Sequence, residues 1–417
     1  MTFPPLLAPL VCFTVATAVQ PIVIRMLRSG GVIDIPGIRS SHTIPTPRGG
    51  GIAVGLGLLV GIVIVGNSTW LPLIVALVFF FSIGLAEDLR GVPIAVRLSL
   101  QLPAGAVVTY LLTLSVPVHL LPRVVLIVIA AVWITGYVNA FNFMDGINGI
   151  SGAHAVIGGL AFATIGVSYR HPSLVIVGAI TAAAGLAFLP WNAGHARVFL
   201  GDVGSYTLGA VLAVLAVYSV LRGVPVEAVL APLSLYVADT GWTLLRRILR
   251  KEDWRRPHRD HAYQRLCDAG WSHQRVSLLT FGVSLAVSAL GIVGSSADAP
   301  VRVVADGLAV ALLVAYLAAP RRLSERLAGG HGPEGYAGST EPGGVRQEHD
   351  AGSEAADGTV HLSIERRHHE VREPQPGTGA ARVLPGDRGP HRGRAPLPVA
   401  TENGESAGAG APGDPSE

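Results

Sequence analysis

Residues 70–86 read WLPLIVALVFFFSIGLA and are followed by Glu87-Asp88-Leu-Arg90-Gly91. An apolar run of about 17 residues is long enough to cross the hydrocarbon core of a bilayer as a helix. The charged residues that follow would then return the chain to water. This alternation of a long apolar run with a short polar segment decides the fold, because it repeats along most of the chain.

The pattern recurs from residue 4 to about residue 320. Apolar residues make up 50% of the chain and charged residues 14%, whereas a soluble domain has roughly 25% charged residues. The sequence therefore predicts an all-α, polytopic transmembrane helical bundle. We expect eleven spans, near residues 4–26, 51–66, 70–86, 95–114, 121–139, 151–168, 173–190, 204–219, 226–245, 276–294 and 303–319.

The chain divides into a membrane part, residues 1–328, and a tail, residues 329–417. The tail is rich in Gly, Pro, Ala, Glu, Arg and His, a composition that does not bury enough apolar surface to fold. We expect it to be disordered and cytoplasmic, with His368 and His369 solvated rather than bound to a metal. The two cysteines, Cys12 and Cys267, provide neither a disulfide framework nor a CxxC metal site.

Arginine divides the loops into two sets. The loops after the odd-numbered spans hold most of the arginines, whereas the other set holds only Arg123, Arg170, Arg222 and Arg302. The positive-inside rule makes the first set cytoplasmic, which places the N-terminus outside and the C-terminus in the cytoplasm. Carboxylates also gather in the cytoplasmic set, and such an acidic cluster within a basic rim suits a metal ion beside a polyanion. These acids are Asp34, Glu87, Asp88, Asp145, Asp202, Glu252, Asp253, Asp260 and Asp268.

The first two cytoplasmic segments each allow two interpretations. In residues 42–51, His42 and Arg48 stand in a loop stiffened by proline, and Gly49-Gly50-Gly51 would let the backbone approach a ligand. A glycine run that packs helices together explains those glycines equally well. Glu87-Asp88 could sit among lipid headgroups, but two adjacent acids beside other polar loops can hold a metal ion or the cationic partners of a phosphate.

The third segment, residues 139–152, carries Asn139, Asn142 and Asp145 at three-residue spacing, followed by Asn148-Gly149. The first three would share a helix face, and the Asn-Gly pair is typical of a turn. A helix end explains the glycine but not the row of amides and acid. Amides can read the edge of a base, and their oxygens can ligate a metal, so we favour a functional interpretation.

The last two segments are weaker alone. Asp202 stands between Gly201 and a Val-Gly-Ser sequence. An aspartate in such a place is most often a helix N-cap. A carboxylate at the start of a helix can also bind Mg²⁺ near a phosphate. The positive-inside rule explains most arginines of residues 246–275. It does not explain His258-Arg259-Asp260-His261, where histidine and arginine together suit a phosphate or pyrophosphate.

These five segments, in this order over residues 1 to about 320, resemble the polyprenyl-phosphate N-acetylhexosamine-1-phosphate transferase family, glycosyltransferase family 4. Residues 139–152 and 199–205 are the most specific, and residues 45–51 and 258–265 look most like the WecA-like, O-antigen initiating branch. Two departures are Glu87, where the family commonly has aspartate, and a histidine loop with fewer histidines. The resemblance implies transfer of a sugar 1-phosphate from a UDP-sugar to undecaprenyl or another polyprenyl phosphate, with Mg²⁺, or alternatively Mn²⁺, as cofactor.

The resemblance also implies roles for particular residues. A phosphate monoester is mostly dianionic at pH 7, since its second pKa is near 6, and an ordinary Asp with a pKa of about 3.9 is a poor base. We therefore assign Asp88, within the catalytic group, to positioning, or to removing the proton only if burial raises its pKa. That group is Asp88, Glu87 and Asp145; the metal ligands are Asp202 and Asn148; the nucleotide contacts are Asn139, Asn142 and Gly149; and the phosphate contacts are His42, Arg48, His258, Arg259 and His261.

The competing interpretation is a secondary transporter of a small anionic solute. Transporters place ionisable residues near the middle of the membrane, whereas here Asp239 and Asp306 fall within the predicted spans and most of the other carboxylates lie at one surface. This distribution favours an interfacial enzyme with its active site facing the cytoplasm, and the resemblance implies that the membrane is a bacterial plasma membrane. The expected partners are the UDP-sugar, the lipid and the membrane, with no nucleic acid, and a homodimer is left open.

Overall fold

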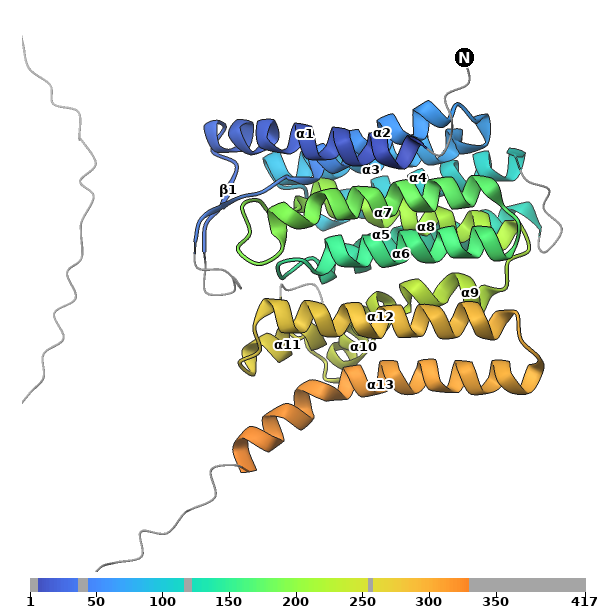
Figure 1. The fold of residues 1–417 in the computed structure, drawn as a ribbon. Helices are drawn as coiled ribbons and strands as arrows, with labels where there is room; N and C mark the ends of the chain where they lie inside the picture. Colours follow the sequence, from blue (N-terminus) through green and yellow to red (C-terminus); the bar gives the residue numbers. More distant parts are fainter. Residues whose placement is uncertain (1–6, 37–43, 116–121, 254–257, 330–417) are drawn as a thin grey trace, which may run out of the picture. The chain divides into compact units, whose positions relative to one another are not determined.

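The computed structural model describes residues 7–36, 44–115, 122–253 and 258–329. Within these residues the chain is almost entirely helical, and Figure 1 shows the long helices lying side by side. The helices are α1 (Ala8–Ser29), α2 (Gly51–Val65), η2 (Ser68–Trp70), α3 (Leu71–Arg90), α4 (Ile94–Ser115), α5 (Arg123–Met144), α6 (Ile150–Ser168), α7 (Pro172–Asn192), α8 (Gly201–Leu221), α9 (Val226–Leu230), η3 (Ala231–Leu233), α10 (Ser234–Leu249), α11 (Ala262–Asp268), α12 (His273–Ser295) and α13 (Ala299–Gly329).

The predicted all-α membrane bundle is confirmed. In the described part of the chain, ten helical stretches are long and apolar enough to cross a membrane. The shorter α2 is also apolar and accounts for the eleventh predicted span, although its 15 residues fall short of the roughly 30 Å of a hydrocarbon core. The chain is therefore a multi-pass membrane protein. The predicted tail, residues 329–417, lies outside the described residues except for Gly329, the last residue of α13.

Some boundaries differ from the sequence prediction. Glu87 and Asp88 lie in the last turn of α3 and not in a loop, and α5 continues through Asn139 and Asn142. A helix keeps its backbone hydrogen bonds satisfied as it leaves the membrane, so polar side chains need not end it. The predicted span 226–245 is broken into α9, η3 and α10, with Pro232 near the start of η3, where proline interrupts a regular helix.

Helix α8 is the centre of the bundle, since every residue from Gly201 to Ser219 is buried. Glycines let its neighbours approach closely. A Cβ added at Gly51 of α2 would lie 2.1 Å from the Cα of Gly204, and one added at Gly84 of α3 would lie 2.3 Å from the carbonyl oxygen of Asp202. Packing between helices, the alternative left open for the glycine run, therefore accounts for Gly51.

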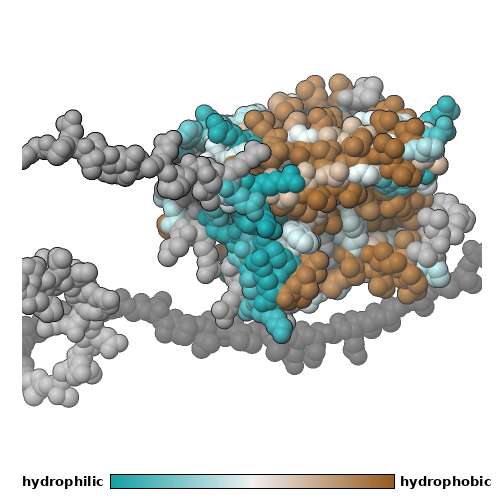
Figure 2. All heavy atoms as spheres, turned by 90° about the horizontal axis from the view of Figure 1, so that it is seen from below, coloured by the Kyte–Doolittle hydropathy of each residue, from teal (hydrophilic) through white to brown (hydrophobic). Residues whose placement is uncertain are grey.

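A small antiparallel sheet accompanies the helices at one end. Strand β1 (Ile33–Asp34) pairs with β2 (Thr46–Pro47), and β1 and α11 lie at the left end of the bundle in Figure 1. We call this the polar end. Figure 2 shows a broad hydrophobic flank with hydrophilic residues gathered mainly toward one end, the distribution expected of helices embedded in a bilayer.

Candidate active site

A cavity of about 850 Å³ opens at the polar end. Its wall is built from segments that are far apart in sequence: the β2–α2 connection, the ends of α3 and α5, the starts of α4 and α8, α10, and α11. Most of the residues selected from the sequence meet there. The predicted site residues that line it are Arg48, Glu87, Asn139, Asn142, Asp145, Asn148, Asp202, His258 and His261.

Backbone pairing places Arg48 on the cavity wall. Phe199 donates its N–H to the carbonyl of Pro47 (2.8 Å) and accepts from the N–H of Gly50 (2.8 Å), and Gly51 donates to Leu200 (2.8 Å). The chain after β2 is thereby fastened to the segment before α8. Arg48 comes to lie next to Asp202, 154 residues further along the chain.

Arg48 joins two carboxylates. Its Nε donates to Oδ1 of Asp88 at 2.8 Å and its Nη2 donates to Oδ1 of Asp202 at 2.7 Å. The side chains of Asp88 and Asp202 are only 2% and 8% exposed, so these charges are shielded from water and depend on the guanidinium. Arg48, Asp88 and Asp202 form a unit that we call the α8 anchor.

Asp88 also caps α8. Its Oδ1 accepts the backbone N–H of Asp202 and its Oδ2 accepts that of Val203, both at 2.9 Å. These are N–H groups that the first turn of a helix leaves without a partner. Gly201 makes the approach possible, because its φ is +75° and an added Cβ would lie 2.5 Å from Asp88 Oδ2. Asp88 is thus enclosed behind the cavity wall, with its carboxylate fully engaged.

Two asparagines of α5 extend this arrangement. Asn142 donates its Nδ2 to Asp202 Oδ1 at 2.8 Å and to the hydroxyl of Ser205 at 2.9 Å. Asn139, one turn earlier, donates to Gln101 of α4 at 2.7 Å. The predicted shared face is therefore observed for these two residues, and it points toward α8 and α4 as well as to the cavity.

Asp145 and Asn148 lie between α5 and α6. Asp145 is the first residue after α5 and lines the cavity. Burial raises the pKa of Asp145 to about 7, and the carboxylates of Asp202 and Asp88 add to the rise while Arg48 opposes it. Asn148 is held by a hydrogen bond from its Nδ2 to the carbonyl of Gly194 at 2.6 Å.

A second anchor is built around an acid of α10. Asp239 is fully buried and accepts the backbone N–H groups of Ala262 at 2.9 Å and Tyr263 at 3.4 Å, at the start of α11. Its carboxylate also contacts Nδ1 of His261 (3.3 Å) and the hydroxyl of Tyr316 on α13 (2.8 Å). We call Asp239, His261 and Tyr316 the α11 anchor.

Glu87 pairs with a cation that the sequence did not single out. Its Oε1 accepts from Nη1 of Arg97 at 3.1 Å and its Oε2 accepts the N–H of Val92. Arg97 lines the cavity, but in the sequence it appears only as one of many arginines that the positive-inside rule explains. No role in the site was assigned to Asp239 from the sequence for a similar reason, since the sequence shows it only as an acid within a predicted span.

Three of the predicted site residues that the structure describes do not line the cavity. Asp88 lies behind it. Gly149, at φ +84°, is buried and donates its N–H to Asn192 Oδ1 at 2.7 Å, which makes it a turn residue at the start of α6. Arg259 pairs with the half-exposed Asp268 at 3.0 Å. His42 lies outside the described residues.

His258 remains on the wall but is weakly suited to carry charge. Burial lowers its pKa, and the neighbouring His261 and Arg247 lower it further. At neutral pH the imidazole would therefore offer hydrogen bonds rather than a positive charge. Of the side chains predicted to contact phosphate, Arg48 provides the permanent charge on the wall.

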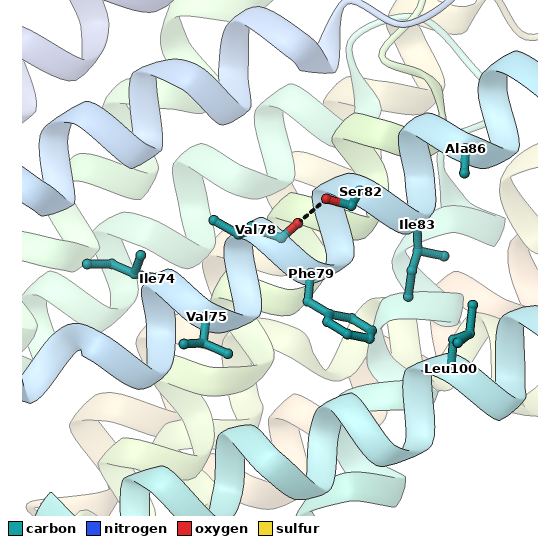
Figure 3. A pocket seen from close by; sticks show the side chains of 8 residues that line it. All are labelled: Ile74, Val75, Val78, Phe79, Ser82, Ile83, Ala86 and Leu100. Carbon is teal, nitrogen blue, oxygen red and sulfur yellow. Dashed lines mark hydrogen bonds between the residues drawn. The ribbon is translucent and has the colours of Figure 1, made fainter. Parts of the chain in front are cut away.

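A second hollow, of about 530 Å³, lies on the flank of α3 and α4 (Figure 3). Its lining side chains are apolar except for Ser82, whose hydroxyl donates to the carbonyl of Val78 at 2.7 Å in its own helix. The hollow offers no group for catalysis. The chemistry therefore belongs to the cavity at the polar end.

Comparison with known proteins identifies relatives of the same general size. Residues 70–220, from η2 to the end of α8, match the family described as Glycosyl transferase family 4. A protein of Bacillus subtilis (strain 168) with the name "Probable undecaprenyl-phosphate N-acetylglucosaminyl 1-phosphate transferase" is 29% identical over 295 residues, which cover 67% of this chain and 82% of that protein.

Two further relatives have names that describe different transfer reactions. The "Decaprenyl-phosphate N-acetylglucosaminephosphotransferase" of Mycobacterium tuberculosis (strain ATCC 25618 / H37Rv) is 29% identical over 303 residues, covering 62% of this chain and 74% of that protein. The "Phospho-N-acetylmuramoyl-pentapeptide-transferase" of Caldicellulosiruptor bescii (strain ATCC BAA-1888 / DSM 6725 / KCTC 15123 / Z-1320) is 29% identical over 300 residues, covering 65% of this chain and 91% of that protein.

Proposed function

This chain belongs to glycosyl transferase family 4, and from that premise we propose that it transfers N-acetylglucosamine 1-phosphate from UDP-N-acetylglucosamine to a polyprenyl phosphate. The B. subtilis and M. tuberculosis relatives carry names for transfer of this sugar phosphate to undecaprenyl and decaprenyl phosphate. The products would be a polyprenyl-diphosphate-sugar and UMP. We further propose that the lipid product initiates a cell-envelope glycan.

One observation carries this proposal beyond the family. The cavity at the polar end combines a permanent cation, Arg48, with the carboxylates of Asp145 and Asp202 and the amides of Asn139 and Asn142. Both reactants are polyanions, so a site that joins them must hold positive charge while it orients two phosphate groups. A transporter of a small anion would not require paired carboxylates beside that cation, and it is not favoured.

The reaction needs positioning more than proton transfer. An oxygen of the lipid phosphate forms a bond to the β-phosphorus of the UDP-sugar as the bond from that phosphorus to the bridging oxygen breaks, and UMP leaves with the bond electrons. The acceptor phosphate is already mostly dianionic at pH 7, since its second pKa is near 6. The enclosure of Asp88, with both oxygens engaged, supports a positioning role for it rather than that of a base.

We propose Mg²⁺ as the cofactor, and the donor atoms on the wall fit it. Asp202 accepts both of its side-chain hydrogen bonds on Oδ1, so Oδ2 has no such partner among the described residues. Asn148 donates through Nδ2, which leaves its Oδ1 for a ligand, and Asp145 lines the same cavity. When bound, Mg²⁺ would neutralise charge on the pyrophosphate.

The number of protein ligands also suits Mg²⁺ bound together with substrate. Within the described ranges, no three His, Cys, Asp or Glu side chains gather closely enough to hold a metal by themselves. Mg²⁺ commonly takes only one or two carboxylates and completes its shell with substrate phosphates and water. Asp202 and Asn148 remain our proposed ligands.

We propose that the polar end faces the cytoplasm of a bacterial plasma membrane, since arginine concentrates in its loops. Single cysteines at residues 48, 145 and 258, in a background lacking Cys12 and Cys267, should resist an impermeant thiol reagent in intact cells and react after lysis. Labelling of two of them from outside would reverse the orientation.

Turnover of the purified full-length protein tests the function. In detergent with undecaprenyl phosphate and Mg²⁺, UMP should be released from UDP-N-acetylglucosamine and lipid-linked sugar phosphate should accumulate in equal amount. UDP-N-acetylgalactosamine and UDP-N-acetylmuramoyl-pentapeptide form the comparison panel, and Asp202→Asn is the low-activity control. Release of UMP only with another UDP-sugar would change the substrate, and no lipid product with any of them would overturn the proposal.

A further inference from the structure

The α11 anchor contains an acid that neither the sequence nor the family relationship assigned to the site. Asp239 lies in α10, and none of its surface is exposed. A carboxylate buried in a membrane bundle is costly unless donors surround it. Asp239 has such donors from α11 and α13, so its placement is specific rather than incidental.

The donors converge from α11 and α13. Ala262 and Tyr263 give their backbone N–H groups, His261 presents Nδ1 at 3.3 Å, and the hydroxyl of Tyr316 donates at 2.8 Å. His261 and the two N–H groups are consecutive in the chain. The start of α11 is therefore folded around this one carboxylate, and the direction of the His261 ring follows from it.

The contact with Asp239 orients the ring of His261. The start of α11 adds a capping box, in which the His261 side chain accepts the backbone N–H of Gln264 and the Gln264 side chain accepts the backbone N–H of His261. The ring is also stacked with Phe143 of α5 and Tyr263 of α11, at centroid distances of 6.0 and 5.9 Å. The plane of the ring is thus fixed, and His261 lines the cavity.

The same helix start reaches the loop that carries Asp145. Tyr263 donates its hydroxyl to the carbonyl of Phe143 at 2.9 Å, and a Cβ added at Gly146 would lie 2.1 Å from that hydroxyl oxygen. Asp239 therefore holds α11 in a place where its first residues touch both the end of α5 and the α5–α6 loop. A shift of α11 would move two parts of the cavity wall.

We propose that Asp239 is a positioning residue for the transfer reaction: it holds the start of α11 and the ring of His261, so that this ring faces the phosphate groups of the substrates. This inference rests on the proposed function. A second carboxylate of this kind, behind a histidine that contacts a ligand, orients the ring without touching the reacting atoms. Its removal should reduce transfer through His261 and not through loss of the fold.

A double-mutant cycle tests this dependence. Asp239→Asn keeps one oxygen to cap α11 but removes the carboxylate, and His261→Asn keeps an amide nitrogen near the position of Nδ1 but has no ring. We expect Asp239→Asn to lower kcat/KM for UDP-N-acetylglucosamine about 10- to 100-fold. In the His261→Asn background, Asp239→Asn should lower kcat/KM by less than about threefold, because the residue through which Asp239 acts is already absent.

Controls separate positioning from stability. Tyr316→Phe removes a donor from the other oxygen of Asp239 and leaves His261 in place, so its turnover should stay within about threefold of the wild type. If Asp239→Asn does not fold, Asp239→Glu replaces it in the cycle, because this variant keeps the charge. The loss of kcat/KM caused by Asp239→Glu should also vanish in the His261→Asn background. Thermal unfolding in detergent reports whether each variant is folded.

The outcomes distinguish this inference from the proposed function. Wild-type protein that forms no lipid product would remove the proposed function itself. Wild-type turnover combined with losses that multiply in the double variant would show that Asp239 and His261 act independently, which would overturn the positioning role. An equal loss in Tyr316→Phe would likewise assign Asp239 to general stability.

Discussion

Asp88 at the end of α3 and Asp239 in α10 are both almost completely buried, and each accepts two backbone N–H groups at the start of another helix. Their remaining partners differ. Asp88 shares the guanidinium of Arg48 with Asp202, whereas the described partners of Asp239 are a histidine ring and hydroxyl groups.

The difference shows what each anchor can tolerate. Removing the cation of the α8 anchor leaves two carboxylates facing one another in a shielded place, and an uncompensated buried charge is among the most destabilising changes in a protein. Removing a donor of the α11 anchor leaves a carboxylate that still has several hydrogen bonds. We therefore expect the α8 anchor to matter for both fold and reaction, and the α11 anchor to matter mainly for the reaction, through Asp239 and His261.

The largest effect is expected from Arg48→Met. Loss of the guanidinium should lower the free energy of unfolding by roughly 2–4 kcal/mol, less than for a completely buried pair because Arg48 is 40% exposed. Turnover should fall about 10²- to 10³-fold, as for removal of one charge-stabilising donor. Thermal unfolding and UMP release measure the two effects.

The matched control for this prediction is Arg321→Met. Arg321 pairs with Glu325 on the surface of α13, and both side chains are mostly exposed. Its loss should change stability by less than about 1 kcal/mol. If Arg48→Met unfolds at no lower temperature than this control, then the α8 anchor does not stabilise the fold through its charges, and the expected difference between the two anchors is wrong.

Asp202→Asn should come next in size. It removes the negative charge that would oppose Mg²⁺ while keeping an oxygen for Arg48 and Asn142. We expect turnover to fall about 100-fold, equivalent to roughly 3 kcal/mol of transition-state stabilisation, and excess Mg²⁺ to restore only part of it. A Mg²⁺ titration of the rate measures this. An unchanged Mg²⁺ requirement would confine Asp202 to the structural anchor.

Asp88→Asn separates positioning from base catalysis. If Asp88 only holds Arg48 and α8, the variant should be slower by about tenfold at every pH between about 6 and 9. A general base would give another pattern, because the lipid phosphate loses its proton unaided above its second pKa near 6. Rates across this range decide between them. Recovery toward the wild-type rate at alkaline pH would restore the role of a base.

The smallest effect concerns the pH dependence of Mg²⁺ binding. Burial raises the pKa of Asp145 to about 7, so as the pH falls through 7 this carboxyl takes up a proton and stops attracting the cation. The Mg²⁺ concentration needed for half-maximal binding should rise below pH 7 and level off above about pH 8, once the carboxyl is ionised. Thermal unfolding at several Mg²⁺ concentrations measures it without substrate.

Two variants test the origin of that dependence. Asp145→Asn should abolish it. Asp239→Asn should leave its midpoint in place, because the charges that act on Asp145 are those of Asp202, Arg48 and Asp88, the α8 anchor. A midpoint that moves in Asp239→Asn instead would mean that the two anchors are electrostatically joined through the cavity.

The sequence by itself determined the membrane fold and the general content of the site. Each apolar run must satisfy its own backbone hydrogen bonds in lipid, so length and composition are enough to predict helices and their number. Polar residues beside such runs, as at Asn139, Asn142, Asp145 and Asp202, stand out against an apolar background. Nine predicted site residues therefore meet on the wall of one cavity.

Only the tertiary structure decided what each acid does. Asp88 and Asp202 look alike in sequence, each at the end of a span, yet one is enclosed behind the wall and the other lines the cavity. The partners of Asp88 on α8 are 114 and 115 residues away, and Tyr316 is 77 residues from Asp239. Contacts over such separations leave no local pattern of spacing or hydropathy, because they depend on how the helices pack.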